Sequence, residues 1–273
     1  MPKLSIIVPT LNSGATIDNC LRSIACQTFA DYEVIVQDGG SSDDTLDRIC
    51  SFRSANEGAH VTVFREKDDG PYDAMNKGMR RARGEWLYFL GSDDEIYNPH
   101  VLTRVIAGPE IEKHDVIYGS VKVVGETAWA KNNPVYGGAF DLEKLLTRNI
   151  CHQAIFYRRR FLKKIGKYNT DYFLLADWDL NMRCWSRTEF KYIDIIVAKF
   201  RAGGLSGTGD DERFMNDLVG NVLKYFNLSL WHPYLNAPVF LGHLDVVKMK
   251  GSRFSLPRVA SRVRRMIRPH AYG

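Results

Sequence analysis

Two adjacent carboxylates, Asp93 and Asp94, follow an apolar run, WLYFL at 86–90, with only Gly91 and Ser92 between. Such a run predicts a buried strand, and the carboxylates then lie at its carboxyl end, where open α/β sheets bind their ligands. Because neighbouring carboxylates repel each other, we expect the pair either on a solvated turn or against a cation such as Mg²⁺ or Mn²⁺. The other polar groups of the chain must distinguish these two interpretations.

Asp38 is a second candidate ligand. It directly follows a strand-like run, YEVIVQ at 32–37, and precedes Gly39 and Gly40. At the end of a strand its carboxylate can accept a hydrogen bond from a base or a ribose. The same carboxylate can instead serve only to organise the Gly39–Gly40 turn, because aspartate often bonds its own backbone two residues on.

Two further segments carry carboxylates that could act on a ligand. DDGPYDAMNKG at 68–78 joins a Gly-Pro turn to a helix start, as a loop closing over a ligand would, or as an ordinary turn with Asp73 as the helix cap. Asp177 and Asp179 are two residues apart on a predicted helix and therefore point about 200° apart. At most one of them can face a site, unless both only stabilise the helix N-terminus.

The elements that position these groups alternate regularly in the first half of the chain. Apolar residues at helical spacing separate four runs that predict strands, at 4–8, 32–37, 60–66 and 86–90. Ser13 is the expected N-cap of the first helix. A βαβαβαβ series predicts an α/β fold with a Rossmann-like, mostly parallel sheet flanked by helices. Its strand-end loops then share one rim, which is the candidate ligand site.

The second half of the chain is less regular. A strand-like segment begins near Asp115, and another covers 190–201. An apolar stripe within 212–231 predicts a longer helix, beyond which prolines interrupt the pattern. We therefore expect three parts, 1–110, 111–210 and 211–273.

Composition limits the class of protein. The chain has 273 residues, of which 45% are hydrophobic and 25% charged, which suffices for one large α/β domain or two smaller lobes. Its five cysteines show no C-x-x-C spacing, which argues against a disulfide framework and a zinc knuckle and favours a reducing compartment. No apolar stretch approaches the roughly 18 to 20 residues of a membrane span, and the N-terminal run is too short for a signal peptide.

The common phosphate-binding loops are absent. The first predicted strand-to-helix turn reads PTLNSGAT, which matches neither G-x-G-x-x-G nor G-x-x-x-x-G-K-[ST]. A nucleotide ligand would therefore need a metal ion or basic groups to balance its phosphates. Asp93 and Asp94 are the nearest metal-ligand candidates in this half of the chain.

As a set, four segments resemble the family 2 inverting glycosyltransferases of the GT-A fold. The resemblance covers roughly residues 4–205, and its specificity lies in the order and spacing of the segments. It is strongest with the bacterial transferases that assemble O-antigen, capsule and exopolysaccharide units, which share DG-x-YDAMNKG and a later HQA. The segments are SIIVPTLNSGATIDNCLRSIACQT, EVIVQDGGSSDDT, DDGPYDAMNKGMRRARGEWLYFLGSDDE and LLADWDLNMR.

The resemblance implies a nucleotide-sugar donor, with a UDP-sugar expected, bound by residues 1–110 at the predicted rim. Pro9, Thr10 and Asp38 would border the nucleoside, with Asp38 on a uracil-type base. Asp69 and neighbouring residues would help to close the donor pocket. Residues 111–210 would then form the lobe that binds the acceptor and carries the catalytic base.

The family's divalent-metal motif, usually D-x-D, falls on Gly91, Ser92 and Asp93, so its first aspartate is missing here. Asp93 keeps the position of the carboxylate that the family uses on the diphosphate and on Mg²⁺ or Mn²⁺. Ser92 would lie beside the donor, and Asp94 is an extra neighbour that could complete the metal site. RAGGLS at 201–206 resembles the family's late Gly-rich segment near the diphosphate.

The resemblance assigns the catalytic base to Asp177, within the family's E-D-x-x-L pattern, whose Glu is replaced here by Ala176. A positioned carboxylate that removes the proton from a sugar hydroxyl can contribute about 10²- to 10⁴-fold to the rate. Asp179 is the competing carboxylate for an acceptor-side role. His152 and Gln153 of the HQA segment are expected to bind the acceptor, with the diphosphate or a structural role as alternatives for His152.

The C-terminus concentrates positive charge. Residues 248–273 include eight Lys or Arg and no Asp or Glu, which leaves −3 on the remainder of a chain whose net charge is +5. Within them, VASRVRRMI at 259–267 has the pattern of an interfacial helix, with a solvated tail as the alternative. We expect this basic tail to bind an anionic membrane surface, at about 1 kcal/mol per basic residue. The expected location is cytoplasmic and peripheral at the inner face of the cytoplasmic membrane.

The expected function is hexosyl transfer in surface polysaccharide biosynthesis, including lipopolysaccharide, from a nucleotide-sugar donor to a saccharide or lipid-linked saccharide acceptor. The QxxRW signature of processive members is absent after Asp177, which favours transfer of a single sugar. A non-catalytic nucleotide-sugar-binding or scaffold protein is the alternative, because Gly91 and Ala176 both replace family carboxylates. A sugar-nucleotidyl transferase would need a Gly-rich basic loop near the N-terminus, and the sequence contains none there. Nucleic acid is not an expected partner, because no aromatic stacking platform accompanies the basic tail.

Overall fold

Strands and helices follow one another in the first half of the chain as the sequence predicts. The computed structural model describes residues 1–125, 132, 134–204 and 211–227. In chain order the elements are β1 (Leu4–Thr10), α1 (Ile17–Ala25), β2 (Tyr32–Asp38), α2 (Thr45–Ala55), η1 (Glu57–Ala59), β3 (Val61–Arg65), α3 (Pro71–Arg81), β4 (Trp86–Phe89), β5 (Glu95–Ile96), α4 (Val101–Ile106), β6 (Val116–Val124), β7 (Val135–Tyr136), α5 (Leu142–Thr147), η2 (His152–Ala154), β8 (Ile155–Arg158), α6 (Arg159–Ile165), α7 (Ala176–Trp185), β9 (Phe190–Arg201) and α8 (Glu212–Phe226).

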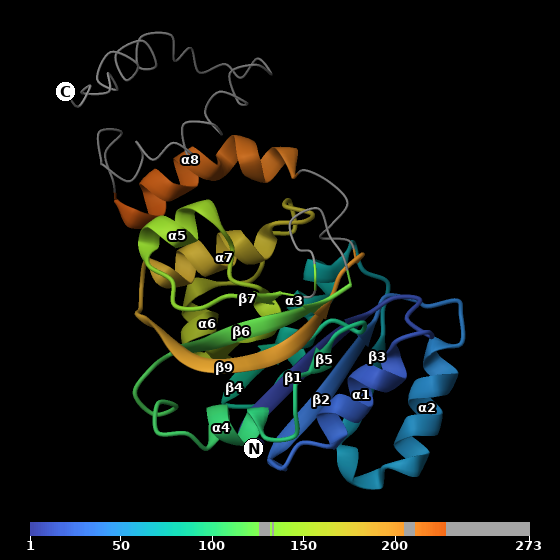
Figure 1. Cartoon of the computed structure of the whole chain (residues 1–273). Helices are drawn as coiled ribbons and strands as arrows, with labels where there is room; N and C mark the ends of the chain where they lie inside the picture. Colours follow the sequence, from blue (N-terminus) through green and yellow to red (C-terminus); the bar gives the residue numbers. More distant parts are fainter. Residues whose placement is uncertain (126–131, 133, 205–210, 228–273) are drawn as a thin grey trace, which may run out of the picture. The chain divides into compact units, whose positions relative to one another are not determined.

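The chain divides into two units, Met1–Asp211 and Glu212–Gly273. The first unit holds the sheet, and helices cover both of its faces (Figure 1). Of the second unit the structure describes α8 and Asn227. The apolar residues Phe214, Leu218 and Val222 of α8 recur four apart and therefore share one face of the helix, as the apolar stripe predicts.

The sheet has the strand order β3-β2-β1-β4-β8-β6-β9-β5, and β7 pairs with β6. Strands β1 to β4 are parallel, and β6 is parallel to β9, so the predicted mostly parallel α/β sheet is confirmed. Thr10 of β1 pairs with Asp38 of β2, which pairs in turn with Arg65 of β3. The loops after these strands therefore leave the sheet at one edge, the rim.

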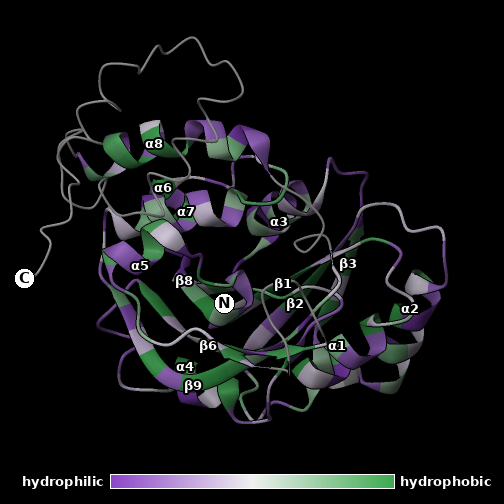
Figure 2. Cartoon of the chain, turned by 45° about the horizontal axis from the view of Figure 1, so that its top comes forward, coloured by the Kyte–Doolittle hydropathy of each residue, from purple (hydrophilic) through white to green (hydrophobic). Residues whose placement is uncertain are grey.

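The two faces of the sheet follow the alternation of side chains along β1. Ile6 and Val8 point into a core cluster that includes Leu21 of α1. Ile7 points to the opposite face, where α3 approaches so closely that a Cβ at Gly78 would overlap Ile7 Cγ2. Only glycine fits this crossing without a shift of the helix or of the Ile7 side chain. The strands carry much of the apolar surface that these helices cover (Figure 2).

An antiparallel strand connects the two halves of the sheet. β8 lies between β4 and β6 and runs antiparallel to both. Tyr88 of β4 and Phe156 of β8 stack across this junction, with ring centroids 4.5 Å apart. Because β8 is antiparallel to β4, its amino end lies beside the carboxyl end of β4. The turn η2, which directly precedes β8, is thereby brought to the rim.

Some expectations need correction or fall outside the described residues. Ser13 does not cap α1 with its side chain; the helix starts at Ile17, and Ser13 Oγ lies 2.7 Å from Ser92 Oγ instead. The five cysteines are all free. Among the described residues, no helix has the length and apolar character that crossing a membrane requires. The predicted interfacial helix at 259–267 lies outside the described residues.

Candidate functional site

At the rim, Asp38 organises the turn that follows β2. The residue is fully buried, and its carboxylate accepts hydrogen bonds from the backbone N–H groups of Gly40 and Ser41, each 3.1 Å from Oδ2, and from the Ser41 hydroxyl. Arg65 Nε lies 3.7 Å from the same carboxylate oxygen. Thr10, also buried, is its neighbour on β1 and donates to the backbone oxygen of Val8. The oxygens of Asp38 thus already have protein donors, as the turn interpretation predicts.

The loop before α3 closes on this turn. A Cβ at Gly39 would overlap Asp68 Oδ2, so the carboxylate of Asp68 lies directly over the glycine. Burial raises the pKa of Asp68 above its ordinary value. Asp69 is exposed, and its backbone N–H donates to Asp73 Oδ2 at 3.2 Å. The side chain that this loop presents to the rim is therefore that of Asp68 rather than that of Asp69.

The turn after β4 accounts for the missing aspartate at position 91. Asp94 N–H donates to Gly91 O at 3.0 Å, which closes the turn. A Cβ at Gly91 would lie 2.6 Å from Asp94 Oδ2 and 2.8 Å from Asp93 Oδ1. The two carboxylates thus occupy the space that a side chain at position 91 would need. A third carboxylate there would meet both steric overlap and charge repulsion.

Asp93 and Asp94 have different environments. Asp94 is 2% exposed; its Oδ2 accepts from Gln153 Nε2 at 2.7 Å and its Oδ1 from Arg201 N–H at 2.9 Å. Burial, followed by the charge of Asp93, raises the pKa of Asp94 to about 6. Asp93 is less buried, and a Cβ at Gly204 would lie 3.2 Å from its Oδ2. Asp93 therefore faces the Gly-rich segment, whereas both carboxylate oxygens of Asp94 accept hydrogen bonds from other residues of the chain.

Asp177 lies in the first turn of α7 and comes from the second half of the chain. It is 7% exposed, and its Oδ1 accepts hydrogen bonds from Tyr72 Oη at 3.0 Å and from Trp178 N–H at 2.9 Å. His152 Nδ1 lies 3.5 Å from its other oxygen, Oδ2. A hydrogen bond holds α7 against the sheet, since Asn181 Oδ1 accepts from Tyr157 Oη of β8 at 2.6 Å.

One turn, η2, contacts both Asp94 and Asp177. His152 approaches Asp177, and the next residue, Gln153, donates to Asp94. His152 Nε2 is buried and has no hydrogen-bond partner among the described residues. The structure thus brings His152, Asp94 and Asp177 into one neighbourhood, although they come from separate parts of the chain.

Asp179 lies apart from this neighbourhood. It is 1% exposed and forms an ion pair with Arg183 Nε at 2.8 Å, four residues along α7. Arg183 also donates to the backbone oxygens of Ile165 and Lys167, which anchors α7 to α6 and the loop after it. As the helical spacing predicts, the two aspartates of α7 do not face the same site, and Asp179 has a structural partner.

Tyr72 is a site residue that the sequence analysis missed. It belongs to the DG-x-YDAMNKG segment, but it is 105 positions from Asp177. No periodicity links positions so far apart, so this contact follows only from the tertiary structure. The sequence signal that could have identified Tyr72 is its position in this segment, directly after the Gly-Pro turn.

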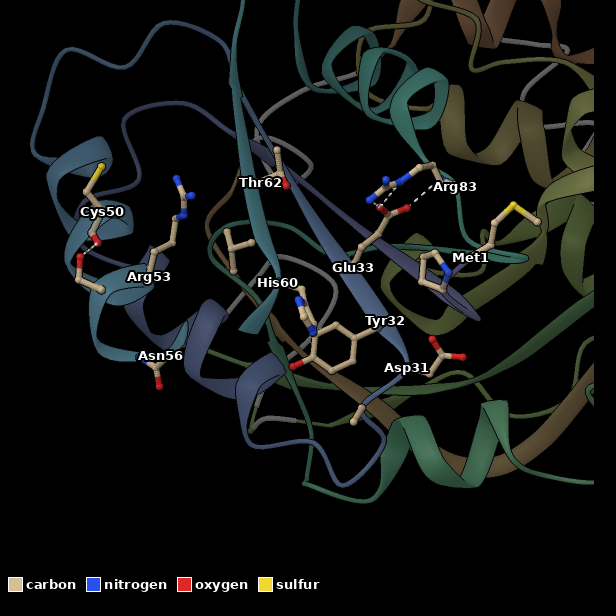
Figure 3. A pocket seen from close by; sticks show the side chains of 14 residues that line it. Met1, Asp31, Tyr32, Glu33, Cys50, Arg53, Asn56, His60, Thr62 and Arg83 are labelled. Atoms are coloured by element: carbon tan, nitrogen blue, oxygen red, sulfur yellow. Dashed lines mark hydrogen bonds and ion pairs between the residues drawn. The ribbon is translucent and has the colours of Figure 1, made fainter. Parts of the chain in front are cut away.

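Within the ranges that the structure describes, no cluster of three or more His, Cys, Asp or Glu side chains is arranged to hold a metal ion. A large open hollow of about 870 Å³ lies away from these carboxylates, at the amino ends of β2 and β3 (Figure 3). Its Arg83 is already paired with Glu33 at 2.9 Å. Because parallel strands place their amino ends opposite their carboxyl ends, this hollow is separate from the rim.

Residues 5–166 match the family model described as glycosyl transferase family 2. A curated protein of Mycobacterium tuberculosis named PGL/p-HBAD biosynthesis glycosyltransferase is 47% identical over 222 residues, which cover 80% of this chain and 84% of that protein. A Campylobacter jejuni protein named GalNAc(5)-diNAcBac-PP-undecaprenol beta-1,3-glucosyltransferase is 38% identical over 126 residues, 46% of this chain and 40% of that protein.

Solved structures of glycosyltransferases share the fold. The structure of S. aureus TarS 1-349 in complex with UDP-GlcNAc matches with a TM-score of 0.66 and 20% identity, covering 96% of this chain and 78% of that one. A mannosyltransferase from Pyrobaculum calidifontis in complex with GDP-Man and Mn²⁺ matches with a TM-score of 0.62 and 18% identity, covering 97% and 79%. The expected GT-A fold is thereby confirmed.

Proposed function

The chain belongs to glycosyl transferase family 2 and is a glycosyltransferase; from that premise, we propose that it moves a single hexose from a nucleotide-sugar donor to a saccharide hydroxyl with inversion of configuration. The observation that carries the proposal is the turn η2. Its consecutive residues, His152 and Gln153, contact Asp177 and Asp94, so a candidate base and a candidate diphosphate site adjoin each other.

Asp177 acts as the general base in this proposal. It removes the proton of the acceptor hydroxyl while that oxygen attacks the anomeric carbon, and the nucleoside diphosphate departs with the electrons of the broken C–O bond. Attack from the face opposite the leaving group inverts the anomeric centre. His152 lies near both Asp94 and Asp177, and in the tautomer that carries a proton on Nε2 this unpartnered atom can donate to the acceptor or to a phosphate oxygen.

The donor lies along the rim. Pro9, Thr10 and the Asp38 turn border the nucleoside, where the backbone and Ser41 offer polar groups that Asp38 holds in place. A UDP-sugar remains the expected donor. Asp68 and Asp69 lie on the loop that closes over it, and of the two, Asp68 contacts the turn.

A divalent ion fits the diphosphate end of this site. Mg²⁺ commonly binds through one or two carboxylates together with substrate phosphates. Asp93 offers such a carboxylate beside Ser92, and it makes no side-chain hydrogen bond to another described residue, whereas both oxygens of Asp94 have protein donors. Asp93 would therefore hold Mg²⁺ or Mn²⁺, with Asp94 supporting the turn behind it. When bound, the ion would offset the charge of the departing diphosphate.

A lipid-linked saccharide is the proposed acceptor, in the biosynthesis of a surface glycolipid or polysaccharide. The name of the Campylobacter jejuni relative specifies an undecaprenol-linked acceptor. The basic tail, residues 248–273, would hold the enzyme peripherally at the inner face of the cytoplasmic membrane. Cutting the chain after Gly251 should then release it from anionic vesicles, and unchanged binding would contradict the membrane role.

A nucleotide-sugar screen tests the proposal. UDP-glucose, UDP-galactose, UDP-GlcNAc and GDP-mannose are compared for the rise in melting temperature that each causes. The best donor is then incubated with octyl glycosides, and product linkage is read by NMR. A product of inverted anomeric configuration is expected, and a retained one would overturn the mechanism. Donor binding without turnover in any member of the panel would favour the alternative, a non-catalytic nucleotide-sugar-binding protein.

A further inference from the structure

We propose that Tyr72 is a positioning residue that holds the Asp177 carboxylate and couples it to the loop that closes the donor site. The inference rests on the proposed role of Asp177 as the base. Tyr72 is the second residue of α3, on the donor side of the site, and Asp177 is the second residue of α7. Their side-chain contact therefore joins the two halves of the active site directly.

The hydroxyl of Tyr72 is placed to orient one oxygen of the base. Tyr72 Oη lies 3.0 Å from Asp177 Oδ1 and 2.8 Å from the backbone oxygen of Leu174. Burial and the charge of Asp177 raise the pKa of Tyr72 well above its ordinary value, so the hydroxyl keeps its proton. This single proton is shared between the Asp177 carboxylate and the Leu174 carbonyl oxygen.

The contacts of Asp177 distinguish its two oxygens. Oδ1 has two donors, the hydroxyl of Tyr72 and the backbone N–H of Trp178, at 3.0 and 2.9 Å. Oδ2 has only His152 Nδ1 nearby among the described residues, at 3.5 Å, too long for a good hydrogen bond. We therefore assign proton removal to Oδ2, with Tyr72 and Trp178 fixing the plane of the carboxyl group.

The same tyrosine is linked to the donor side through its own loop. Asp68 lies over Gly39 in the turn after β2. Gly70, in a left-handed conformation with φ 116°, approaches Phe173, since a Cβ at this glycine would lie 3.4 Å from Phe173 Cε2. A shift of this loop when the donor binds would move Tyr72 relative to Asp177. The orientation of the base thereby depends on the donor loop.

The chain offers a matched control for removing this hydroxyl. Tyr168 is fully buried, and its ring centroid is 5.3 Å from that of Tyr72. Its hydroxyl has no hydrogen-bond partner among the described residues. Tyr168→Phe therefore removes the same atom from the same aromatic cluster without removing a hydrogen bond to Asp177.

The experiment compares wild type, Tyr72→Phe, Tyr168→Phe, Asp177→Asn and the double variant Tyr72→Phe/Asp177→Asn. Each is assayed for nucleoside diphosphate release with the best donor of the four-sugar panel and an octyl glycoside, well below its melting temperature. Since a hydrogen bond to a charged group is lost, Tyr72→Phe should lower kcat about 10- to 100-fold, with KM values within about twofold of wild type. Tyr168→Phe should resemble wild type, and the double variant should be no slower than Asp177→Asn.

The outcomes separate the two proposals. If Tyr72→Phe behaves like Tyr168→Phe, or slows the Asp177→Asn enzyme by the same factor as it slows wild type, Tyr72 does not act through the base and the inference fails. A change confined to KM would likewise overturn it. If Asp177→Asn itself keeps wild-type turnover, the assignment of the base fails instead.

Discussion

Replacing Asp94 by asparagine is expected to stabilise the fold near neutral pH, although it alters a residue of the candidate site. Asp94 is 2% exposed, and burial together with the charge of Asp93 raises its pKa from 3.8 to about 6. A carboxyl group with a raised pKa binds its proton more tightly in the folded state than in the unfolded state. Its contribution to stability is therefore complete below about pH 4 and is lost as pH rises to about 6.

The size of the effect follows from the same shift. Each pKa unit corresponds to about 1.4 kcal/mol, so holding Asp94 ionised costs the folded protein up to roughly 3 kcal/mol above about pH 6. Asparagine has the shape of the carboxyl group but no charge. Its Oδ1 can accept from Arg201 N–H, and Gln153 can turn its amide to accept from the new NH₂ group.

The assay is urea unfolding of wild type and Asp94→Asn across this pH range, in excess chelator so that no cation stabilises the carboxylate. The variant should be about 1 to 3 kcal/mol more stable near neutral pH and close to wild type at about pH 4. Asp31→Asn, at an exposed position, controls for the general effect of removing a negative charge. A variant that is less stable than wild type near neutral pH, or whose gain is equal at both ends of the range, would show that the pKa of Asp94 is not raised in the folded protein.

Three further changes have expected outcomes. Gly78→Ala should lower the free energy of unfolding by about 1 to 3 kcal/mol, measured by urea titration, because the new methyl group overlaps Ile7. Gly91→Ala should also be destabilising, since its Cβ lies within 3 Å of the Asp93 and Asp94 carboxylates, and a wild-type melting temperature would contradict the crowded turn. Excess chelator should reduce sugar transfer, and full activity in its presence would remove the proposed metal role of Asp93.

The sequence was sufficient for the parts of the fold that local patterns encode. The alternation in β1 and the helical spacing in α1 predict a parallel sheet, and a parallel sheet places Thr10, Asp38 and the turn after β4 at one edge. The position of β8 was not predictable in this way. A short apolar strand carries no sign of its partners, and only pairing with β4 brings His152 and Gln153 to the rim.

The environment of each carboxylate was even less accessible from the sequence. Asp93 and Asp94 are adjacent and identical in type, yet Asp94 is held by Gln153, which is 59 positions away. Likewise, helical spacing separated Asp177 from Asp179, but the hydroxyl that orients Asp177 comes from Tyr72 in the other half. Such differences depend on contacts between distant segments, and spacing rules describe only near neighbours.

Asp177 is the proposed base of the sugar transfer reaction, and the turnover of Asp177→Asn with the best donor and an octyl glycoside tests this role most directly. We expect a loss in kcat of about 100-fold or more, because the amide cannot remove a proton, while the same nucleotide sugar still raises the melting temperature as it does for wild type. Unaltered release of nucleoside diphosphate in the presence of acceptor would contradict it.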